Sequence, residues 1–342
     1  MIDIVRNSEL IEKIASDHKF DVVMVERVLW MSIVLEAISK SERLNQDFAL
    51  MGGSAIVFLY GNIYRLSVDL DMDYINNPNL GKKDIEEIGQ IQNEHKEEIQ
   101  KIANKLQLKY ESITQEDERF LQIKLNYPSK YLEQGSVELD LGYRYCHTVL
   151  KVENKSWPNI FGIEDWIGFD IKTYQQEELW ASKINAMVST KRIDVKKEVY
   201  LGFKNKIRHL YDVWILVKDI LPHRELDLEL LKKLCILFGI TRIEEYEFCR
   251  GETLKGYLQK NYDNDLYPVL KTTQVTPKLI QMQREVRIFL DKYIFSYNEQ
   301  EREFMEDFYS ENFRPNKLFN VEISNRLNEM YFYDEMLKMI KR

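Results

Sequence analysis

Glycine, proline and cysteine are scarce in this chain, with 13, 7 and 3 copies among 342 residues. Few glycines and prolines beside many aromatic residues argue against long disordered segments. The cysteines are odd in number, lie far apart and form no CxxC pattern, which argues against a disulfide framework or a cysteine zinc site. We therefore expect reduced thiols in a cytoplasmic protein.

The sequence also lacks a long apolar run and an excess of positive charge. No apolar stretch approaches the roughly 18 residues of a membrane span, and the N-terminus MIDIVRNSEL is acidic where a signal peptide is basic and then apolar. The formal charge of −8 argues against a protein that coats nucleic acid with its whole surface. These absences predict a soluble cytoplasmic protein with no membrane partner.

The length exceeds what one hydrophobic core usually serves, so we expect two domains. The pattern is mixed in the first half and almost entirely helical afterwards. We predict an α/β (α+β) domain with a mixed sheet over residues 1–195, N-terminal helices included, and an α-helical bundle over residues 196–342.

Local patterns place the elements of the first domain. Two helices are expected over residues 3–41, and a long amphipathic helix over 82–106. Apolar runs or apolar–polar alternation predict strands, since alternate side chains of a strand share a face. These strands are expected at 48–52, 66–74, 108–113, 120–127, 136–143 and 168–174.

Three alternating aspartates, Asp69, Asp71 and Asp73, lie within the strand predicted at 66–74. Like charges on one strand face repel, so a cationic partner is missing. Carboxylates two residues apart lie about 7 Å from one another and are hard ligands for Mg²⁺ or Mn²⁺. The other interpretation is an exposed edge strand that uses charge against aggregation.

A Gly52-Gly53-Ser54 turn precedes the acidic strand. Glycines let a backbone approach phosphate closely, and the start of a helix offers unpaired N–H groups. Ser54 is expected to cap a short helix over 55–60. Turn, helix and acidic strand together predict a nucleoside triphosphate site, whereas the simpler interpretation is a tight turn with a helix cap.

A two-metal site for phosphoryl transfer needs a third carboxylate. Glu138 and Asp140 project from one face of the strand predicted at 136–143. Alternation alone does not choose between them.

Four blocks follow one another in order over residues 52–212. They are Gly52-Gly53-Ser54-Ala55 with Arg65-x-Ser67-x-Asp69-x-Asp71, the segment VELDLGYR at 137–144, the helix Glu178-x-x-Ala181-x-Lys183, and Arg208-His209-x-x-Asp212. Together these blocks resemble the AbiEii/AbiGii-type nucleotidyltransferase toxins of the DNA polymerase beta-like nucleotidyltransferase superfamily.

The resemblance implies a role for each matched residue. Asp69 and Asp71 would hold the metal ions, with Asp140 as the third acid. Gly52, Gly53 and Ser54 would bind phosphates, and Lys183 would contact the triphosphate. Asp212 would assist in catalysis or orient Lys183 or Arg208, and the alternative is a structural salt bridge. Arg65 and Ser67 would brace the strand or touch phosphate. The family's first aspartate in the fourth block is His209 here.

The segment 182–208 concentrates positive charge, with eight lysines and arginines against two acidic residues. Such a concentration in an acidic chain predicts a path for an RNA backbone. The alternative is a set of solvated helix ends.

Together these features predict a Mg²⁺-dependent nucleotidyltransferase, the toxin of a toxin–antitoxin or phage-defence pair. It would transfer a nucleotide from an NTP to RNA, foremost the tRNA 3′ end, and an adjacent gene would encode its antitoxin. One alternative is an enzyme that nucleotidylates a small molecule such as an antibiotic. Another is a catalytically inactive nucleotide- or RNA-binding module.

Overall fold

The computed structural model describes residues 2–61, 63–77, 79–80, 85–113, 119–164, 166–188, 206–240, 262–273, 277–330 and 333. The chain forms two compact units. Unit 1 consists of Met1–Gln175, Val269–Gln274 and Glu329–Phe332, and unit 2 of Gln176–Pro268, Val275–Asn328 and Tyr333–Arg342. The domain boundary predicted at residues 195–196 lies outside the described residues.

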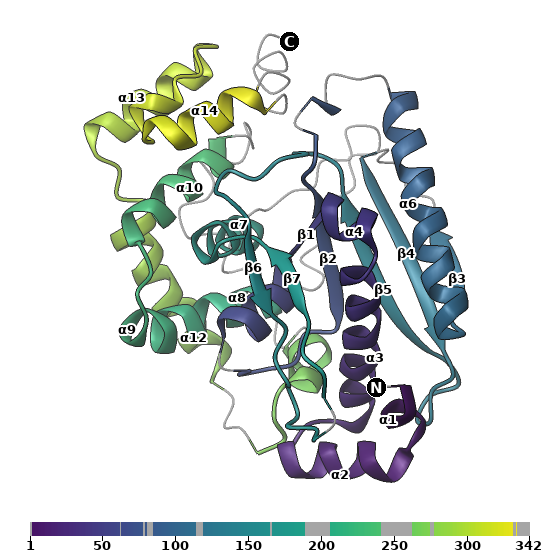
Figure 1. The fold of residues 1–342 in the computed structure, drawn as a ribbon. Coiled ribbons are helices and arrows are strands. Elements are labelled where there is room, and N and C mark those ends of the chain that lie inside the picture. Colours follow the sequence, from purple (N-terminus) through teal and green to yellow (C-terminus); the bar gives the residue numbers. More distant parts are fainter. Residues whose placement is uncertain are drawn as a thin grey trace, which may run out of the picture. The chain divides into compact units, whose positions relative to one another are not determined.

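Unit 1 is built on a mixed seven-stranded sheet in the order β3-β4-β5-β2-β1-β7-β6 (Figure 1). β2 is parallel to β5 and β1 is parallel to β7, while the other neighbours are antiparallel. The strands are β1 (Phe48–Met51), β2 (Asp69–Tyr74), β3 (Lys109–Ile113), β4 (Phe120–Tyr127), β5 (Gly135–Gly142), β6 (Glu153–Ser156) and β7 (Asp170–Thr173).

The strand predictions are confirmed for six of these seven strands. The sequence pattern missed β6, whose four residues ENKS are all polar. An edge strand that pairs with one neighbour only needs no alternation, because neither face has to enter the core. β2 also begins at Asp69, three residues later than the alternation from Leu66 suggests.

The N-terminal region holds more helices than the two predicted over residues 3–41. It contains α1 (Ile2–Arg6), α2 (Ser8–His18) and α3 (Val22–Ser39), followed by α4 (Glu42–Asp47). The extra break lies at Asn7, whose side chain accepts a hydrogen bond from the Leu10 N–H and so starts a new helix.

One face of the sheet is covered by α3 and by α6 (Ile85–Leu106) (Figure 1). α6 turns a heptad-like stripe inward that includes Ile88, His95, Ile99 and Ala103. α3 is mostly apolar and largely buried. The sheet residues under these helices are the apolar halves of the alternating strands, so the acidic halves lie on the opposite face.

Unit 2 is helical, as the sequence predicts. The α-helices among its described residues are α7 (Gln176–Val188), α8 (Lys206–Ile215), α9 (Leu221–His223), α10 (Leu228–Ile240), α12 (Leu279–Phe289), α13 (Glu299–Tyr309) and α14 (Val321–Glu329). The short π and 3-10 segments in the described part of the chain are η1 (Ala55–Tyr60), η3 (Leu216–Ile220), η6 (Tyr262–Leu266), η7 (Tyr267–Val269), η8 (Leu290–Ile294) and η9 (Pro315–Lys317). Among the described residues, no helix is long and apolar enough to cross a membrane.

A buried carboxylate fixes the entry to β5. Glu26 of α3 is fully buried and accepts hydrogen bonds from the Ser129 hydroxyl at 2.5 Å and the Lys130 N–H at 2.9 Å. A buried charge is tolerated only when such donors replace water. Glu26 therefore ties the loop before β5 to the central helix.

We expect Glu26→Ala to lower the free energy of unfolding by about 1–3 kcal/mol, because two part-buried hydrogen bonds to a buried carboxylate are lost. Glu36→Ala is the matched control on the same helix, since it removes an ion pair whose lysine partner, Lys40, is 66% exposed in its side chain. Urea unfolding followed by circular dichroism measures both. Equal effects of the two variants would contradict the anchoring role of Glu26.

Candidate active site

The acidic face of the sheet brings together carboxylates from two strands. Because β2 and β5 pair in parallel, Asp71 is the register partner of Asp140, and Asp69 is the partner of Glu138. Register partners on neighbouring strands project from the same face, about 4.8 Å apart at the backbone. The pairing therefore unites acids that lie almost 70 residues apart in the sequence.

Asp140 and Glu138 have different surroundings. The Asp140 carboxylate accepts a hydrogen bond from the Gln122 amide at 2.8 Å. Glu138 lies 4.0 Å from the Lys124 ammonium, and both of these side chains are more than a third exposed. Asp140 is thus the acid that stands directly beside Asp71, while the charge of Glu138 has a lysine near it.

Gly52 places the turn against Asp71. Its φ of +71° lies in the left-handed region that favours glycine. A Cβ atom at this position would lie 1.9 Å from Asp71 Oδ2. The close approach requires glycine, and it puts the start of the short helix α5 (Gly52–Ser54) beside the carboxylate pair.

The structure corrects the predicted helix cap. The helix starts at Gly52, with Met51 as its N-cap and no side-chain cap, so Ser54 lies within the first turn. The Ser54 hydroxyl is buried and donates to the Asp69 carbonyl oxygen at 2.6 Å. Ser54 therefore links the turn to the first residue of the acidic strand.

Asp73, the third aspartate of the alternation, has a separate environment. Its carboxylate accepts a hydrogen bond from the Tyr174 hydroxyl at 3.0 Å, and a side chain at Gly142 would collide with it. Burial raises the pKa of Asp73 to about 6, against the opposing effects of the Tyr174 hydrogen bond and the Arg144 charge. Sequence alternation did not predict the contact between Asp73 and Tyr174, because Tyr174 follows β7, which is far from β2 in the sequence.

Arg65 and Ser67 are both buried, at 2% and 4% exposure. The Arg65 guanidinium donates to the Leu66 carbonyl oxygen at 2.7 Å. This contact favours the bracing role over phosphate contact, and the nucleotide-binding role of both residues stays a prediction.

Unit 2 holds the other two predicted catalytic residues as a buried ion pair. Lys183 of α7 lies 3.4 Å from the Asp212 carboxylate of α8, with side-chain exposures of 5% and 0%. This ion pair is compatible with an orienting role of Asp212 and equally with a purely structural salt bridge, so the catalytic roles of both residues stay predictions. Most of the predicted basic segment, residues 189–205, lies outside the described residues.

Among the described residues, no group of three or more histidine, cysteine, aspartate or glutamate side chains is arranged to hold a metal ion. The chemistry of the carboxylates on β2 and β5 nevertheless suits a divalent cation. Asp69, Asp71 and Asp140 offer only carboxylate oxygens, the ligands that Mg²⁺ and Mn²⁺ prefer. Two adjacent carboxylates also repel one another unless a cation lies between them. Asp71 and Asp140 are the residues best placed to hold it.

Comparisons with known proteins define the class. A family model described as the nucleotidyl transferase AbiEii toxin of type IV toxin–antitoxin systems matches residues 33–304. The fold is similar to that of MenT4, a nucleotidyltransferase toxin from Mycobacterium tuberculosis H37Rv, with a TM-score of 0.58 and 13% identity over 98% of this chain and 99% of that one. A search of curated proteins finds no match. This chain is a nucleotidyltransferase. It belongs to the AbiEii family of type IV toxins.

Family membership confirms the predicted enzyme class and the mixed fold with a helical C-terminal region. Nucleotidyltransferases of this kind generally use an NTP and a divalent metal, and a toxin of this class implies an antitoxin.

We expect Gly52→Ala to abolish nucleotidyl transfer, because the new methyl group would displace Asp71 and strain the backbone. Gly89→Ala on α6 is the control, since a Cβ there meets no atom within 4 Å. Transfer assays on both purified variants measure the effect. Wild-type activity of Gly52→Ala would contradict the close approach.

We expect Lys183→Met to destabilise the protein by about 3–5 kcal/mol, because it leaves the Asp212 charge buried without its lysine. The double variant Lys183→Met/Asp212→Asn removes both charges and should recover most of that loss. Urea unfolding of the two variants tests this. Equal stability of the single and double variants would show that the pair is not coupled.

Proposed function

We propose that this chain transfers a nucleoside monophosphate from an NTP to an RNA acceptor in a Mg²⁺-dependent reaction. The 3′ end of tRNA is the leading candidate for the acceptor. The observation that carries the proposal is the register of β2 and β5, which sets Asp71 beside Asp140 next to the Gly52 turn.

The residues divide the chemistry between them. An acceptor hydroxyl attacks the α-phosphorus, a new P–O bond forms, and the bond to the β-phosphate oxygen breaks to release pyrophosphate. Asp140 takes the hydroxyl proton, and Gly52 and Gly53 offer backbone N–H groups to the phosphates. Ser54 supports that turn through its bond to the Asp69 carbonyl oxygen.

Asp69, Asp71 and Asp140 would hold the divalent ions. When bound, such ions lower the pKa of the attacking hydroxyl and offset the negative charge of the leaving group. We propose that Lys183 contacts the departing pyrophosphate and that Asp212 orients this lysine. We also propose that a gene adjacent to this one encodes the cognate antitoxin.

The test is label transfer from each of four α-labelled NTPs to total tRNA with Mg²⁺. We expect labelled RNA with one or two nucleotides, and none with Asp69→Ala or after chelation. Label on RNA from an Asp69→Ala sample would overturn the carboxylate assignment. Pyrophosphate release without labelled RNA would favour a small-molecule acceptor, and NTP binding without release would favour an inactive binding module.

The same assay separates Asp140 from Glu138. We expect Asp140→Asn to lower turnover by at least about 100-fold, as the loss of a general base and a metal ligand would. Glu138→Gln is the matched control and should retain most activity, because Glu138 lies beside Lys124. The reverse order of effects would assign the third acid to Glu138.

A further inference from the structure

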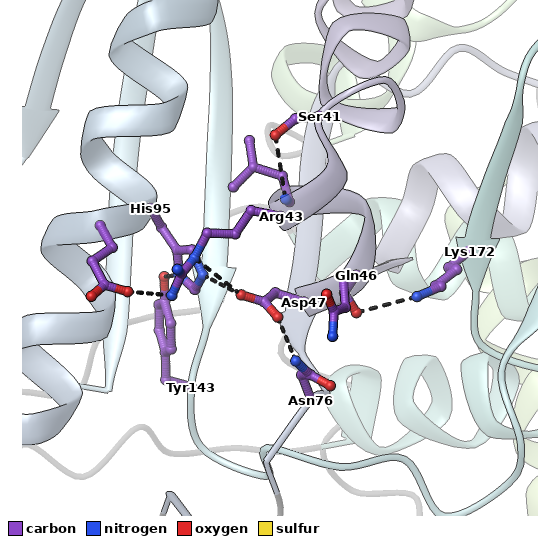
Figure 2. A network of polar contacts seen from close by, with 10 residues as sticks. Ser41, Arg43, Gln46, Asp47, Asn76, His95, Tyr143 and Lys172 are labelled. Carbon is purple, nitrogen blue, oxygen red and sulfur yellow. Dashed lines mark hydrogen bonds and ion pairs between the residues drawn. The ribbon is translucent and has the colours of Figure 1, made fainter.

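A polar network with a buried centre joins the ends of three strands in unit 1 (Figure 2). At its centre is Asp47, the last residue of α4, directly before β1. One carboxylate oxygen of Asp47 accepts from the Asn76 amide at 2.7 Å, and the other lies 2.8 Å from His95 Nε2. Asn76 follows β2 in the chain, so Asp47 links the start of β1 to the end of β2.

His95 extends the network to β5. This α6 residue has no exposed surface, and its Nδ1 lies 2.9 Å from the hydroxyl of Tyr143, the residue after β5. Its ring also packs against Phe48, Tyr74 and Tyr143, with centroid distances of 4.8, 5.7 and 5.8 Å. One imidazole therefore contacts residues at the ends of β1, β2 and β5.

These three strands carry the acidic site, and their register decides its geometry. No hairpin joins β2 to β5, because α6, β3 and β4 lie between them in the chain. A turn therefore cannot set their alignment, and a slip of one residue would turn every side chain of a strand to the other face. The alignment of parallel strands must come from backbone pairing and from side chains that fix the strand ends.

We infer that Asp47, His95 and Tyr143 form a register lock that keeps Asp71 opposite Asp140, with His95 as a positioning residue for the metal-binding carboxylates. The inference rests on the proposed metal site. His95 itself lies on the helix-covered side of the sheet, whereas Asp71 and Asp140 project from the opposite face. It acts through the backbone of β2 and β5 and does not touch the substrate.

The test uses Tyr143→Phe, which removes one hydroxyl, and His95→Phe, which keeps an aromatic ring and removes both hydrogen bonds. Mn²⁺ binding to the full-length protein without NTP is followed by electron paramagnetic resonance. We expect both variants to raise the Kd for Mn²⁺ by roughly tenfold, the lower end of what groups behind metal ligands contribute. Amide exchange in β2 and β5 should become faster as well.

Tyr131→Phe is the matched control, because the Tyr131 hydroxyl donates to the Ser8 carbonyl oxygen of α2 and not to a strand end. It should leave Mn²⁺ binding unchanged. If His95→Phe does not fold, Tyr143→Phe alone tests the register lock, because it removes a single buried oxygen and should leave the fold intact. A lower Tm for Tyr143→Phe with Mn²⁺ binding equal to wild type would overturn the lock and leave only a contribution to stability.

Mn²⁺ binding to Asp71→Ala shows whether a negative result concerns the register lock or the proposed metal site. Loss of Mn²⁺ binding in Asp71→Ala, with wild-type binding in Tyr143→Phe and His95→Phe, would overturn the lock while the metal site stands. Wild-type binding in Asp71→Ala would overturn the metal site itself, and with it the basis of the lock.

Discussion

The parallel pairing of β2 with β5 is the constraint on which the acidic site depends. It sets two carboxylates side by side on one face of the sheet, an arrangement that opposes folding because like charges on neighbouring strands repel. The surroundings reduce this cost in part: Gln122 donates to Asp140, and Lys124 lies near Glu138. The divalent metal that nucleotidyltransferases of this kind generally use would offset the remaining repulsion between the two carboxylates.

The alternating aspartates show how one strand face supports different roles. Asp71 stands at the glycine turn, where the backbone comes close enough to exclude any side chain at position 52. Asp73, two residues further on, is turned to Tyr174 and lies over Gly142, and its pKa rises to about 6 through burial. Two aspartates of one strand face, about 7 Å apart, thus have different surroundings: Asp71 faces the glycine turn and Asp73 faces Tyr174.

Much of this was predictable from the sequence because alternation and glycine placement are local signals. They located Asp69, Asp71 and Asp140 on strands and the turn at Gly52. The prediction that Ser54 caps a helix was wrong. Its hydroxyl donates a hydrogen bond to the Asp69 carbonyl oxygen of β2, whereas a cap would accept one from a helix N–H. The register of β2 and β5 is a property of the fold that alternation does not reveal. It pairs Asp140 with Asp71 and Glu138 with Asp69, so the third acid stays a prediction.

Two different kinds of interaction hold the predicted site residues in place. The carboxylates of β2 and β5 depend on strand register, whereas Lys183 and Asp212 depend on each other as a buried pair between two helices. Removal of one partner of a buried ion pair leaves the other charge without its counter-charge, so loss of either residue alone lowers stability. Sequence change in such an enzyme is therefore freest outside these contacts. That freedom is consistent with a shared fold at 13% identity to another nucleotidyltransferase toxin.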